Sequence, residues 1–156
     1  MQTNDEKYMR EALKEAEKAF ERDEVPVGAV LVHGDKIVAR AHNQIKLLKD
    51  PTAHCEMIAI TQGADYFRNE RLLDSTLYVT IEPCPMCAGA MVLGRIKRVV
   101  YGAADAKSGA CGSVMNIASN SKLNHRIKID NGVLEKECAG LLQEFFAKKR
   151  KERSLA

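Results

Sequence analysis

Side chains able to bind a metal or move a proton lie in two short stretches of the sequence. The first stretch, TAHCEM, contains His54 and Glu56, and the second, EPCPMCAGAM, contains Cys84 and Cys87. Two cysteines three residues apart can form a disulfide, a redox dithiol, a structural metal clip or part of a catalytic metal centre. Their spacing alone does not choose among these.

Cys84 and Cys87 stand where we expect a helix to begin, directly after the β-rich run STLYVTI. A spacing of three places both sulfurs on one face of the first turn, where free N–H groups and the helix dipole favour thiolates. Pro83 and Pro85 suit such a helix start. The pattern fits a metal site, but it equally fits a thioredoxin-like dithiol beside a βαβ unit.

His54 and Glu56 favour the metal. Residues two apart on a helix point in nearly opposite directions, but at an open helix start His54 can ligate while Glu56 reaches a neighbouring molecule. One histidine and two cysteines leave the fourth position of a tetrahedral zinc open, as in catalytic sites. A structural site would need a fourth protein ligand, for which Cys111 in GACGS is the candidate.

The charge of such a centre indicates a role for the acid. Two thiolates offset the charge of a zinc ion, so it should acidify its water less than a three-histidine site would. A base is therefore needed beside the water, and Glu56 is the carboxylate in these motifs that suits it. The simpler alternative for Glu56 is a favourable charge at a helix N-terminus.

The elements that must position these residues can be read from the hydrophobic pattern. We expect helices, strands and turns in alternation. In chain order we expect first a helix over 5–22 with its apolar stripe inward and Asn4 as cap, then two strands in VPVGAVLVHGDKIVARAHN joined at HGD, and then a helix in PTAHCEMIAITQGAD with Pro51 and Thr52 at its start. The strand STLYVTI, the helix CPMCAGAMVLGR and the strand IKRVVYGA follow. Last come a helical turn in VMNIASN, a strand RIKI and a C-terminal helix whose inward residues are Leu134, Cys138, Leu141, Leu142 and Phe145.

This alternation predicts an α/β protein: a three-layer α/β/α arrangement with a central mixed five-stranded sheet. The first two strands should be antiparallel, and the later ones parallel because we expect each later crossover to contain a helix. In such sheets, sites form where the C-terminal ends of strands meet helix N-termini, which is where both motifs lie. With 156 residues and no repeats or linker, residues 1–156 are expected to form a single domain.

Charge and cysteine content narrow the function class. The net charge is +3, and the segment KKRKER at 148–153 alone contributes +4, so the basic excess is a C-terminal helix end or tail over 148–156. Such a tail can neutralise phosphates, or can simply be a solvated helix end. Five cysteines without an export signal or membrane-spanning run predict reduced thiols, a cytoplasmic protein and no membrane contact.

The order His-x-Glu followed by Pro-Cys-x-x-Cys is the signature of zinc nucleobase deaminases. The chain also carries EVPVGAVLV, DPTAHCEM, TLYVTIEPCPMCAGAM, RVVYGAADAKSGACGS, NHR and LLQEFF. With these stretches, residues 5–150 resemble the bacterial tRNA-specific adenosine deaminases. The resemblance implies a cytidine deaminase-like fold, a homodimer, and conversion of adenosine to inosine at the wobble (first anticodon) position of a tRNA anticodon stem-loop.

The resemblance also implies residue roles. It makes His54, Cys84 and Cys87 the ligands of one Zn²⁺ per subunit and Glu56 the proton shuttle, with zinc-bound hydroxide attacking C6 of the adenine. The backbone carbonyl of Glu82 is expected to accept from the departing amine. Contacts to the base or the anticodon loop are implied for a further set of residues: Asn43, Asp105, Lys107, Asn124, His125, Phe145 and Arg150 in the basic helix end.

These RNA contacts each have a structural alternative. Asn43 can simply end a strand, DAKSG can be a surface turn and NHR a strand lead-in, and Phe145 falls on the inward stripe of its helix. One residue departs from the family pattern: Cys55 stands where alanine is usual. We expect Cys55 to be a small buried apolar residue, the alternative being an oxidation-prone thiol beside the metal.

Three other functions fit parts of the sequence. A zinc deaminase of a free base or nucleotide, such as guanine or deoxycytidylate, would share the metal motifs. A thiol oxidoreductase would use a reversible Cys84–Cys87 disulfide and hold no stoichiometric zinc. A zinc-stabilised nucleic-acid-binding module would bind RNA without releasing ammonia.

Overall fold

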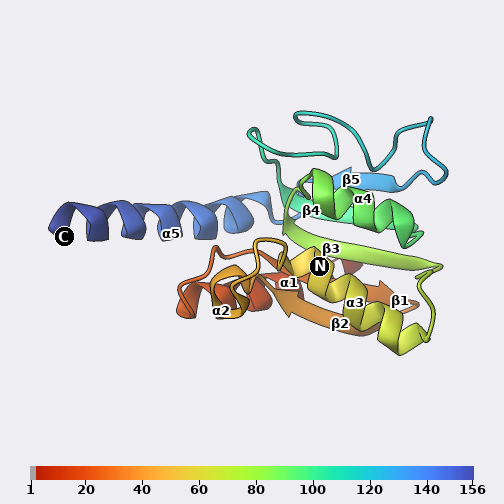
Figure 1. Ribbon diagram of the computed structural model, residues 1–156, viewed down its shortest axis with the longest axis horizontal. Coiled ribbons are helices and arrows are strands. Elements are labelled where there is room, and N and C mark those ends of the chain that lie inside the picture. Colours follow the sequence, from red (N-terminus) through yellow and green to blue (C-terminus); the bar gives the residue numbers. More distant parts are fainter. Residues whose placement is uncertain (1–2) are drawn as a thin grey trace.

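A five-stranded mixed sheet forms the centre of the molecule. The computed structural model describes residues 3–156, and the strands lie in the order β2-β1-β3-β4-β5 (Figure 1). The strands are β1 (Gly28–His33), β2 (Lys36–His42), β3 (Ser75–Ile81), β4 (Arg98–Ala103) and β5 (Lys128–Asn131). The β1–β2 and β1–β3 pairs are antiparallel, and the β3–β4 and β4–β5 pairs are parallel. The predicted mixed five-stranded sheet is confirmed.

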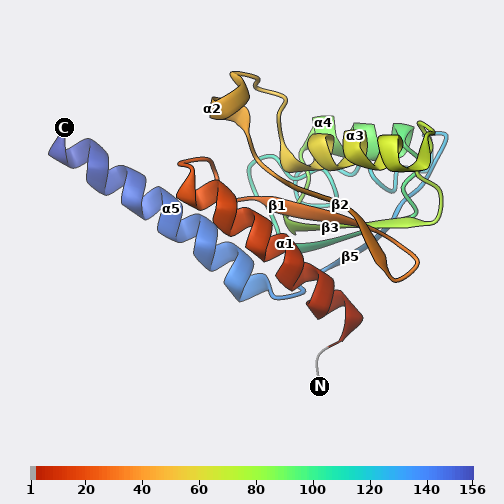
Figure 2. The ribbon, with the colours of Figure 1, turned by 90° about the horizontal axis from the view of Figure 1, so that it is seen from below.

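Helices cover both faces of the sheet, which completes the three predicted layers. α1 (Asn4–Glu21) and α5 (Glu135–Leu155) lie on one face, and α3 (Cys55–Phe67) and α4 (Pro85–Leu93) on the other (Figure 2). The one-turn helix α2 (Ile45–Leu48), which we did not expect, follows β2. Two buried apolar clusters fill the interlayer spaces, one built around Leu31, Val79 and Met91 and the other around Met9, Val30 and Val100.

Alternate residues of β1 and β3 serve the two clusters. Leu31 and Val79 face α3 and α4, whereas Val30 and Tyr78 face α1 and α5. A strand buried on both faces reads as a continuous apolar run, which is the pattern that STLYVTI showed in the sequence. The sheet therefore holds α3 and α4 firmly, and both helices begin at the same end of it (Figure 1).

Two predicted helix starts are wrong. The cap of α1 is Thr3, not Asn4, because the Thr3 hydroxyl accepts a hydrogen bond from the Glu6 N–H at 3.1 Å. α3 begins at Cys55, so Pro51 and Thr52 lie before it. The Asp50 carboxylate accepts from both the N–H and the hydroxyl of Thr52, at 2.8 and 2.7 Å, and this turn ends before the helix begins.

The connection from β4 to β5 also differs from the prediction. Residues 104–127 contain no helix, so the helical turn expected in VMNIASN is wrong, and the segment has only an isolated bridge between Cys111 and Asn116. β5 begins at Lys128, two residues later than predicted. The strands are parallel as expected, although the crossover is a long irregular segment. Loops of this length within a compact domain are usually functional.

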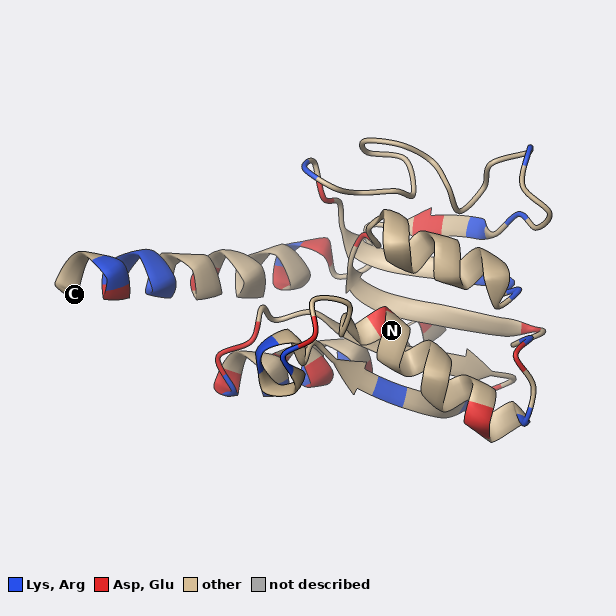
Figure 3. Cartoon of the chain, in the orientation of Figure 1, with Lys and Arg blue, Asp and Glu red and all other residues tan. Residues whose placement is uncertain are grey.

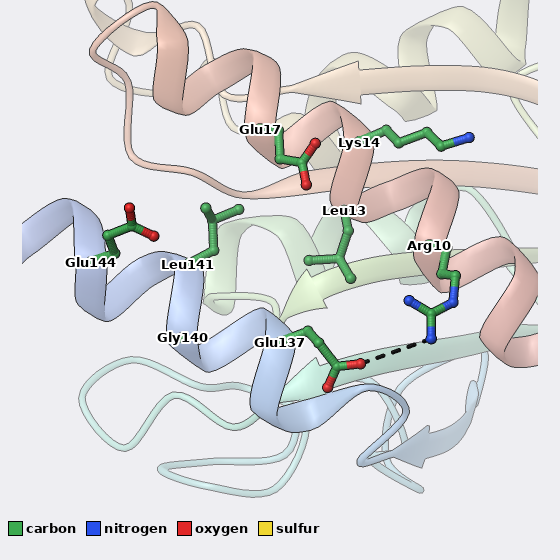
Figure 4. Close-up of a pocket in the computed structure, with 8 residues that line it drawn as sticks. All are labelled: Arg10, Leu13, Lys14, Glu17, Glu137, Gly140, Leu141 and Glu144. Atoms are coloured by element: carbon green, nitrogen blue, oxygen red, sulfur yellow. Dashed lines mark ion pairs between the residues drawn. The ribbon is translucent and has the colours of Figure 1, made fainter.

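α1 and α5 pack side by side and leave a groove between them (Figure 4). Leu13 and Leu141 lie in the groove, and the Arg10 guanidinium lies 4.0 Å from the Glu137 carboxylate across it. Among residues 3–156, no helix has the length and apolar character needed to cross a bilayer. The five cysteines, all within the described part of the chain, are free, as the sequence predicted.

Candidate metal centre and active site

The starts of α3 and α4 bring three ligand side chains together. His54 is the N-cap residue of α3, Cys84 is the N-cap residue of α4, and Cys87 lies in the first turn of α4. Their ligand atoms all lie within 4.8 Å of one another, and each sulfur lies 3.6 Å from His54 Nδ1. One imidazole and two thiols at this spacing are a donor set for a single divalent ion such as zinc.

The N-cap positions explain how neighbouring residues can act together. His54 and Cys84 both have extended backbone, with ψ of 150° and 173°. His54 therefore stands outside the helix while Glu56 stands within its first turn, so the two side chains need not point in opposite directions. The difficulty raised by the His-x-Glu spacing disappears because α3 starts one residue after His54.

Asn43 holds the start of α3 in place. Its side-chain oxygen accepts a hydrogen bond from the Cys55 N–H at 2.8 Å, which pairs one of the N–H groups that a helix start leaves free. Asn43 is buried, and it follows directly after β2. The predicted base-contacting residue is thus also a structural link between the end of β2 and the candidate metal ligand His54.

The two thiols differ in proton affinity. The Cys87 thiol donates a hydrogen bond to Cys84 and, with His54 nearby, lowers the pKa of Cys84 to about 4 despite partial burial. The pKa of Cys87 is raised, because Cys84 accepts its proton and because it is buried. The hydrogen bond to Cys84 raises the pKa of His54. A bound divalent cation would lower the pKa of the second thiol as well and select the thiolate pair.

Glu56 is a buried carboxyl group beside the three ligands. Its side chain is 4% exposed, and burial raises its pKa above the ordinary value for glutamate. The Cys55 thiol lies 3.0 Å from Glu56 Oε1 and donates to it. A carboxyl group with a raised pKa inside a cleft suits proton transfer in both directions near neutral pH.

A cavity of about 200 Å³ opens above the ligands. It is smaller than the roughly 300–1,000 Å³ of pockets for drug-sized ligands, which suits a single planar base. His54, Glu56 and Cys84 form its metal side. The rest of its wall comes from the segment before β1, the residue after β2, the start of α2, the end of β3 and the residue after it, and the loop after β4: Val25, Val27, Asn43, Ile45, Ile81, Glu82, Asp105 and Ser108.

A second hollow of about 480 Å³ adjoins the cavity and runs towards α5. The two hollows share part of their lining, namely Val25, Val27, Ile81, Asp105 and Ser108. The second hollow adds Lys107 from the loop after β4 and Phe146 from α5. We refer to these two neighbouring hollows together as the groove, whose lining includes His54 and Cys84 at one end and Phe146 of α5 at the other.

Of the residues expected to contact RNA, three lie along this groove. Asn43 and Asp105 line the cavity, and Lys107 lines the adjoining hollow. The Asp105 carboxylate accepts hydrogen bonds from the N–H groups of Lys107 and Ser108, at 2.9 and 3.2 Å. The DAKSG segment is therefore a tight turn, which was the structural alternative to an RNA contact. This turn also forms part of the cavity wall.

The other expected RNA contacts lie elsewhere. Phe145 is 3% exposed and packs edge-to-face against Phe20, so it presents no free face to a ligand. Arg150 is exposed near the C-terminal end of α5. His125 Nε2 lies 2.6 Å from the Ile96 carbonyl, just before β4, and Asn124 is exposed beside it.

Asn124 and His125 are thus remote from the metal ligands. Cys84 follows the C-terminal end of β3, and β3 and β4 are parallel, whereas Ile96 precedes the N-terminal end of β4. A six-residue strand spans about 20 Å. In this chain the two residues therefore lie at the opposite end of the sheet from the cavity.

Two functional candidates escaped the sequence analysis. Phe146 is 42% exposed and lines the groove, one residue after the buried Phe145. The helical stripe that places Phe145 inward also turns Phe146 away from the core, so the helical period could have found it. The carboxylate of Glu82 is bound to the loop after β4, which no local pattern indicates.

Comparisons with known proteins agree with this geometry. The model of the MafB19-like deaminase family matches residues 3–150. The tRNA-specific adenosine deaminase of Bacillus subtilis (strain 168) is 49% identical over 154 residues, covering 99% of this chain and 96% of that protein. The protein of the same name from Haemophilus influenzae (strain ATCC 51907 / DSM 11121 / KW20 / Rd) is 49% identical and covers 97% of this chain and 88% of its own.

Solved structures of deaminases also match this chain. One, from a study of A-to-I editing by tRNA:A34 deaminases at the wobble position of transfer RNA, is 43% identical with a TM-score of 0.83, and covers 86% of this chain and 98% of that chain. A guanine deaminase from Nitrosomonas europaea matches with a TM-score of 0.76 at 20% identity, over 91% of this chain and 84% of that chain. The second likeness concerns the fold alone.

The sheet order, the two helix starts and the His-Cys-Cys cluster beside a buried glutamate define a deaminase with the cytidine deaminase-like fold. Two curated relatives that are 49% identical over nearly the whole of this chain narrow the class, because both are named tRNA-specific adenosine deaminase. The chain belongs to the family of tRNA-specific adenosine deaminases.

Proposed function

We propose that this protein converts adenosine to inosine at the wobble position of a tRNA anticodon. The observation that carries the proposal is the His54, Cys84 and Cys87 cluster beside the buried Glu56, at the base of a cavity that fits one base. Relatives named tRNA-specific adenosine deaminase support adenosine in tRNA as the substrate.

His54, Cys84 and Cys87 would hold one Zn²⁺ per subunit. The donor set and the 3.6 Å distances between the sulfurs and the imidazole nitrogen support this ion. When bound, zinc would lower the pKa of a water molecule in the cavity. Three protein ligands leave a coordination position for that water, as in other catalytic zinc sites.

Glu56 would move the protons of the reaction. It takes a proton from the attacking water and passes it to N1 of the adenine, and it then moves the remaining proton of the added hydroxyl group from the oxygen on C6 to the amine, which leaves as ammonia. Water and adenosine are consumed, and inosine and ammonia are formed. Burial supports this role, because it raises the pKa of Glu56 and lets the carboxyl group hold a proton between the two transfers.

The remaining wall of the cavity would orient the base. Asn43 is positioned by its bond to the Cys55 N–H, and its amide nitrogen remains a donor for the base. The backbone carbonyl of Glu82 would accept a hydrogen bond from the departing amine. The target base must leave the stack of its loop to enter a cavity of this size.

The groove beyond the cavity would take the neighbouring nucleotides. Lys107 supplies a cation to the hollow and Phe146 supplies an exposed aromatic face. Proteins bind single-stranded RNA with these two kinds of group, the cation at the phosphates and the aromatic ring stacked on a base. Arg150 extends the same side towards the basic end of α5. Asn124 and His125 lie far from the cavity of their own chain. They would therefore contact only parts of the RNA that are remote from the base edited in that cavity.

We further propose a homodimer. The sequence of α4, PMCAGAMVL, contains no charged residue, although its outward residues lie at the surface of one protomer and Leu93 is 78% exposed. A helix that is apolar on all sides is normally buried, which supports a second copy packed against it. We assign the protein to the cytoplasm, where its tRNA substrate and a reducing environment for five thiols are found.

One assay tests the proposed activity. Purified protein is incubated with an anticodon stem-loop that carries adenosine at the wobble position, with free adenosine, guanine and deoxycytidylate as comparators. We expect inosine at that position and no ammonia from the free compounds. Deamination of guanine or deoxycytidylate in preference to the stem-loop would replace the proposal with a free-base or nucleotide deaminase.

Metal analysis separates the remaining alternatives. Under reducing conditions we expect one zinc per chain. A protein without stoichiometric metal and with a reversible Cys84–Cys87 disulfide would be a thiol oxidoreductase. A protein that holds zinc and binds the stem-loop but releases no ammonia would be a nucleic-acid-binding module.

A further inference from the structure

Glu82 is a buried carboxylate that joins two parts of the site. It follows β3 and precedes the metal ligand Cys84 by two residues, and it is 3% exposed. Its own N–H donates to the Ala103 carbonyl at 2.9 Å, which continues the pairing of β3 with β4. The side chain therefore projects from a fixed backbone at the end of the sheet where the metal ligands lie.

The Glu82 side chain accepts four hydrogen bonds from the loop after β4. Oε1 accepts from the Asp105 N–H at 3.1 Å and from the Ser113 hydroxyl, and Oε2 accepts from the N–H groups of Cys111 and Ser113 at 3.0 and 3.1 Å. The carboxylate binds the loop as an anion in a nest of N–H groups.

The loop is shaped to fit around this carboxylate. A Cβ atom on Gly109 would lie 2.3 Å from the Glu82 carboxyl carbon, so only glycine allows the approach. The Ala110 N–H donates to the Pro83 carbonyl at 2.8 Å, which ties the loop to the residue between Glu82 and Cys84. Since residues 104–127 form no helix or strand, these bonds replace regular pairing.

The bound loop supplies part of the wall of the cavity. Asp105 and Ser108 line the cavity, and Lys107 lines the adjoining hollow. Asp105 is held from both sides, since its N–H donates to Glu82 and its carboxylate accepts from Ser108. Where this wall stands relative to Cys84 therefore depends on Glu82.

We propose that Glu82 is a positioning residue, whose carboxylate holds the 105–113 loop against the Cys84 segment and so sets the RNA-facing wall of the cavity. The inference rests on the proposed function only for the identity of the substrate. It predicts that losing the carboxylate releases the loop while the metal ligands stay in place.

Amide hydrogen exchange on the full-length zinc-loaded protein tests the first half of the inference. In Glu82→Gln, one acceptor oxygen becomes a donor, and we expect the amides of Asp105, Cys111 and Ser113 to exchange at least about tenfold faster. Ser113→Ala removes one of the four donors and should give a smaller increase at the same amides. It also serves if Glu82→Gln does not fold.

Glu24 offers a matched control. It is also 3% exposed, and its carboxylate accepts from the N–H groups of Lys46 and Leu47 at 3.1 and 2.9 Å. Glu24→Gln should speed exchange at those two amides and leave the 105–113 loop unchanged. Faster exchange spread evenly over the whole chain in Glu82→Gln, or unchanged exchange in the loop, would overturn the inference.

Kinetics test the second half. With one zinc per chain retained, we expect Glu82→Gln to lower kcat/KM on the stem-loop about tenfold or more, chiefly through KM, because a mobile wall binds RNA poorly. Unchanged kcat/KM together with a mobile loop would overturn the positioning role. If the wild-type protein fails to deaminate the stem-loop, the proposed function falls, and the exchange data alone decide whether Glu82 holds the loop.

Discussion

Glu56 is the residue on which the proposed chemistry depends most directly. It is buried beside the three metal ligands but is not one of them, so its removal should leave the metal in place. We expect Glu56→Ala to keep one zinc per chain and the native circular dichroism spectrum while turnover on the stem-loop falls by about 10²–10⁴-fold or more. Deamination close to the wild-type rate in a zinc-loaded variant would remove Glu56 from the mechanism.

Two interpretations of Cys55 can be distinguished by experiment: a small buried apolar residue, or an oxidation-prone thiol beside the metal. It is 0% exposed within the apolar cluster under α3 and α4, and burial, with the charge of Glu56, raises the pKa of its thiol well above the usual value. A buried neutral thiol should not react. We expect iodoacetamide to leave Cys55 unmodified in the native protein and to modify it after unfolding in denaturant, as read by mass spectrometry.

The control for this prediction is Cys84. It is partly exposed and the pKa of its thiol is lowered, so it should be alkylated once a chelator has removed the metal. Labelling of Cys55 in protein that is still folded would make it an exposed redox-sensitive thiol, the alternative that its position beside His54 suggested.

At the scale of elements, the sequence predicted what is periodic. β3 and α4 stand where their apolar patterns placed them, because those patterns report burial, and burial is what the sheet provides. The start of α3 was missed because Pro51 and Thr52 are common at helix starts and also in the turn that Asp50 closes. Local composition does not distinguish the two.

The 104–127 segment was beyond local prediction for a different reason. Its conformation depends on Glu82, which lies more than twenty residues earlier in the chain, and on the Ala110–Pro83 bond. The grouping of His54, Cys84 and Cys87 was predictable because few residue types bind zinc and the spacing of such residues is constrained by helix geometry. The cavity wall that faces them has no comparable signature.

Phe145 and Phe146 on α5 form a natural pair for separating core packing from RNA contact. Phe145 is 3% exposed against Phe20, and Phe146 is 42% exposed in the groove. We expect Phe145→Ala to lower the free energy of unfolding by about 3–5 kcal/mol, measured by urea denaturation. Phe146→Ala should change stability little and weaken stem-loop binding by about 1–3 kcal/mol, measured by titration.

The opposite outcome is equally clear. If Phe146→Ala binds the stem-loop as tightly as the wild type, the aromatic face in the groove does not stack on a base. If Phe145→Ala remains as stable as the wild type and loses only RNA affinity, Phe145 contacts RNA directly, as the family resemblance implied.

An ion-pair network attaches α1 to the sheet. The Arg98 guanidinium donates to both carboxylate oxygens of Asp5, at 3.0 and 2.9 Å, and to Asp130 at 2.7 Å, and the Tyr78 hydroxyl donates to Asp5 at 2.7 Å. The hydrogen bonds from Arg98, followed by that from Tyr78, lower the pKa of Asp5 below its ordinary value of 3.8, although partial burial opposes them.

The direction of this shift fixes a pH dependence. A carboxyl group with a lowered pKa in the folded state stabilises the protein above its unfolded pKa and loses that contribution as pH falls through the folded pKa. We expect Asp5→Asn to be less stable than the wild type by a constant amount at neutral pH, with the difference shrinking below about pH 3.8. Urea denaturation at several pH values measures it, and a difference that grows on acidification would contradict it.

At the scale of the whole molecule, the site and the basic helix end lie on the same side. The metal ligands stand at one end of the sheet, and α5 extends beyond the sheet with its Lys and Arg residues gathered near its C-terminus (Figure 3). The groove lined by Lys107 and Phe146 connects the two regions. An anticodon loop with one base in the cavity could therefore reach α5 with its backbone phosphates.

Two adjacent cations on α5 test this arrangement. Arg150 is exposed and makes no ion pair with any residue of the 3–156 range, whereas Lys149 contacts the carboxylates of Asp23 and Glu152. When an unpaired cation of the protein binds a phosphate, a counterion is released from the RNA. A cation that is already paired with a carboxylate neutralises the phosphate less and so releases less counterion. Arg150→Gln should thus weaken binding of the stem-loop and reduce the slope of log affinity against log salt by about 0.7–0.9.

Lys149→Gln is the matched comparison, since it removes the same charge from the neighbouring position. It should change the salt slope less than Arg150→Gln does, and should instead loosen α5 from the turn at Asp23, seen as faster amide exchange after residue 145. Affinities measured between about 50 and 200 mM salt give both slopes. Equal slopes for Arg150→Gln and the wild type would mean that the basic end of α5 is a solvated helix end and that RNA binding stops at the groove.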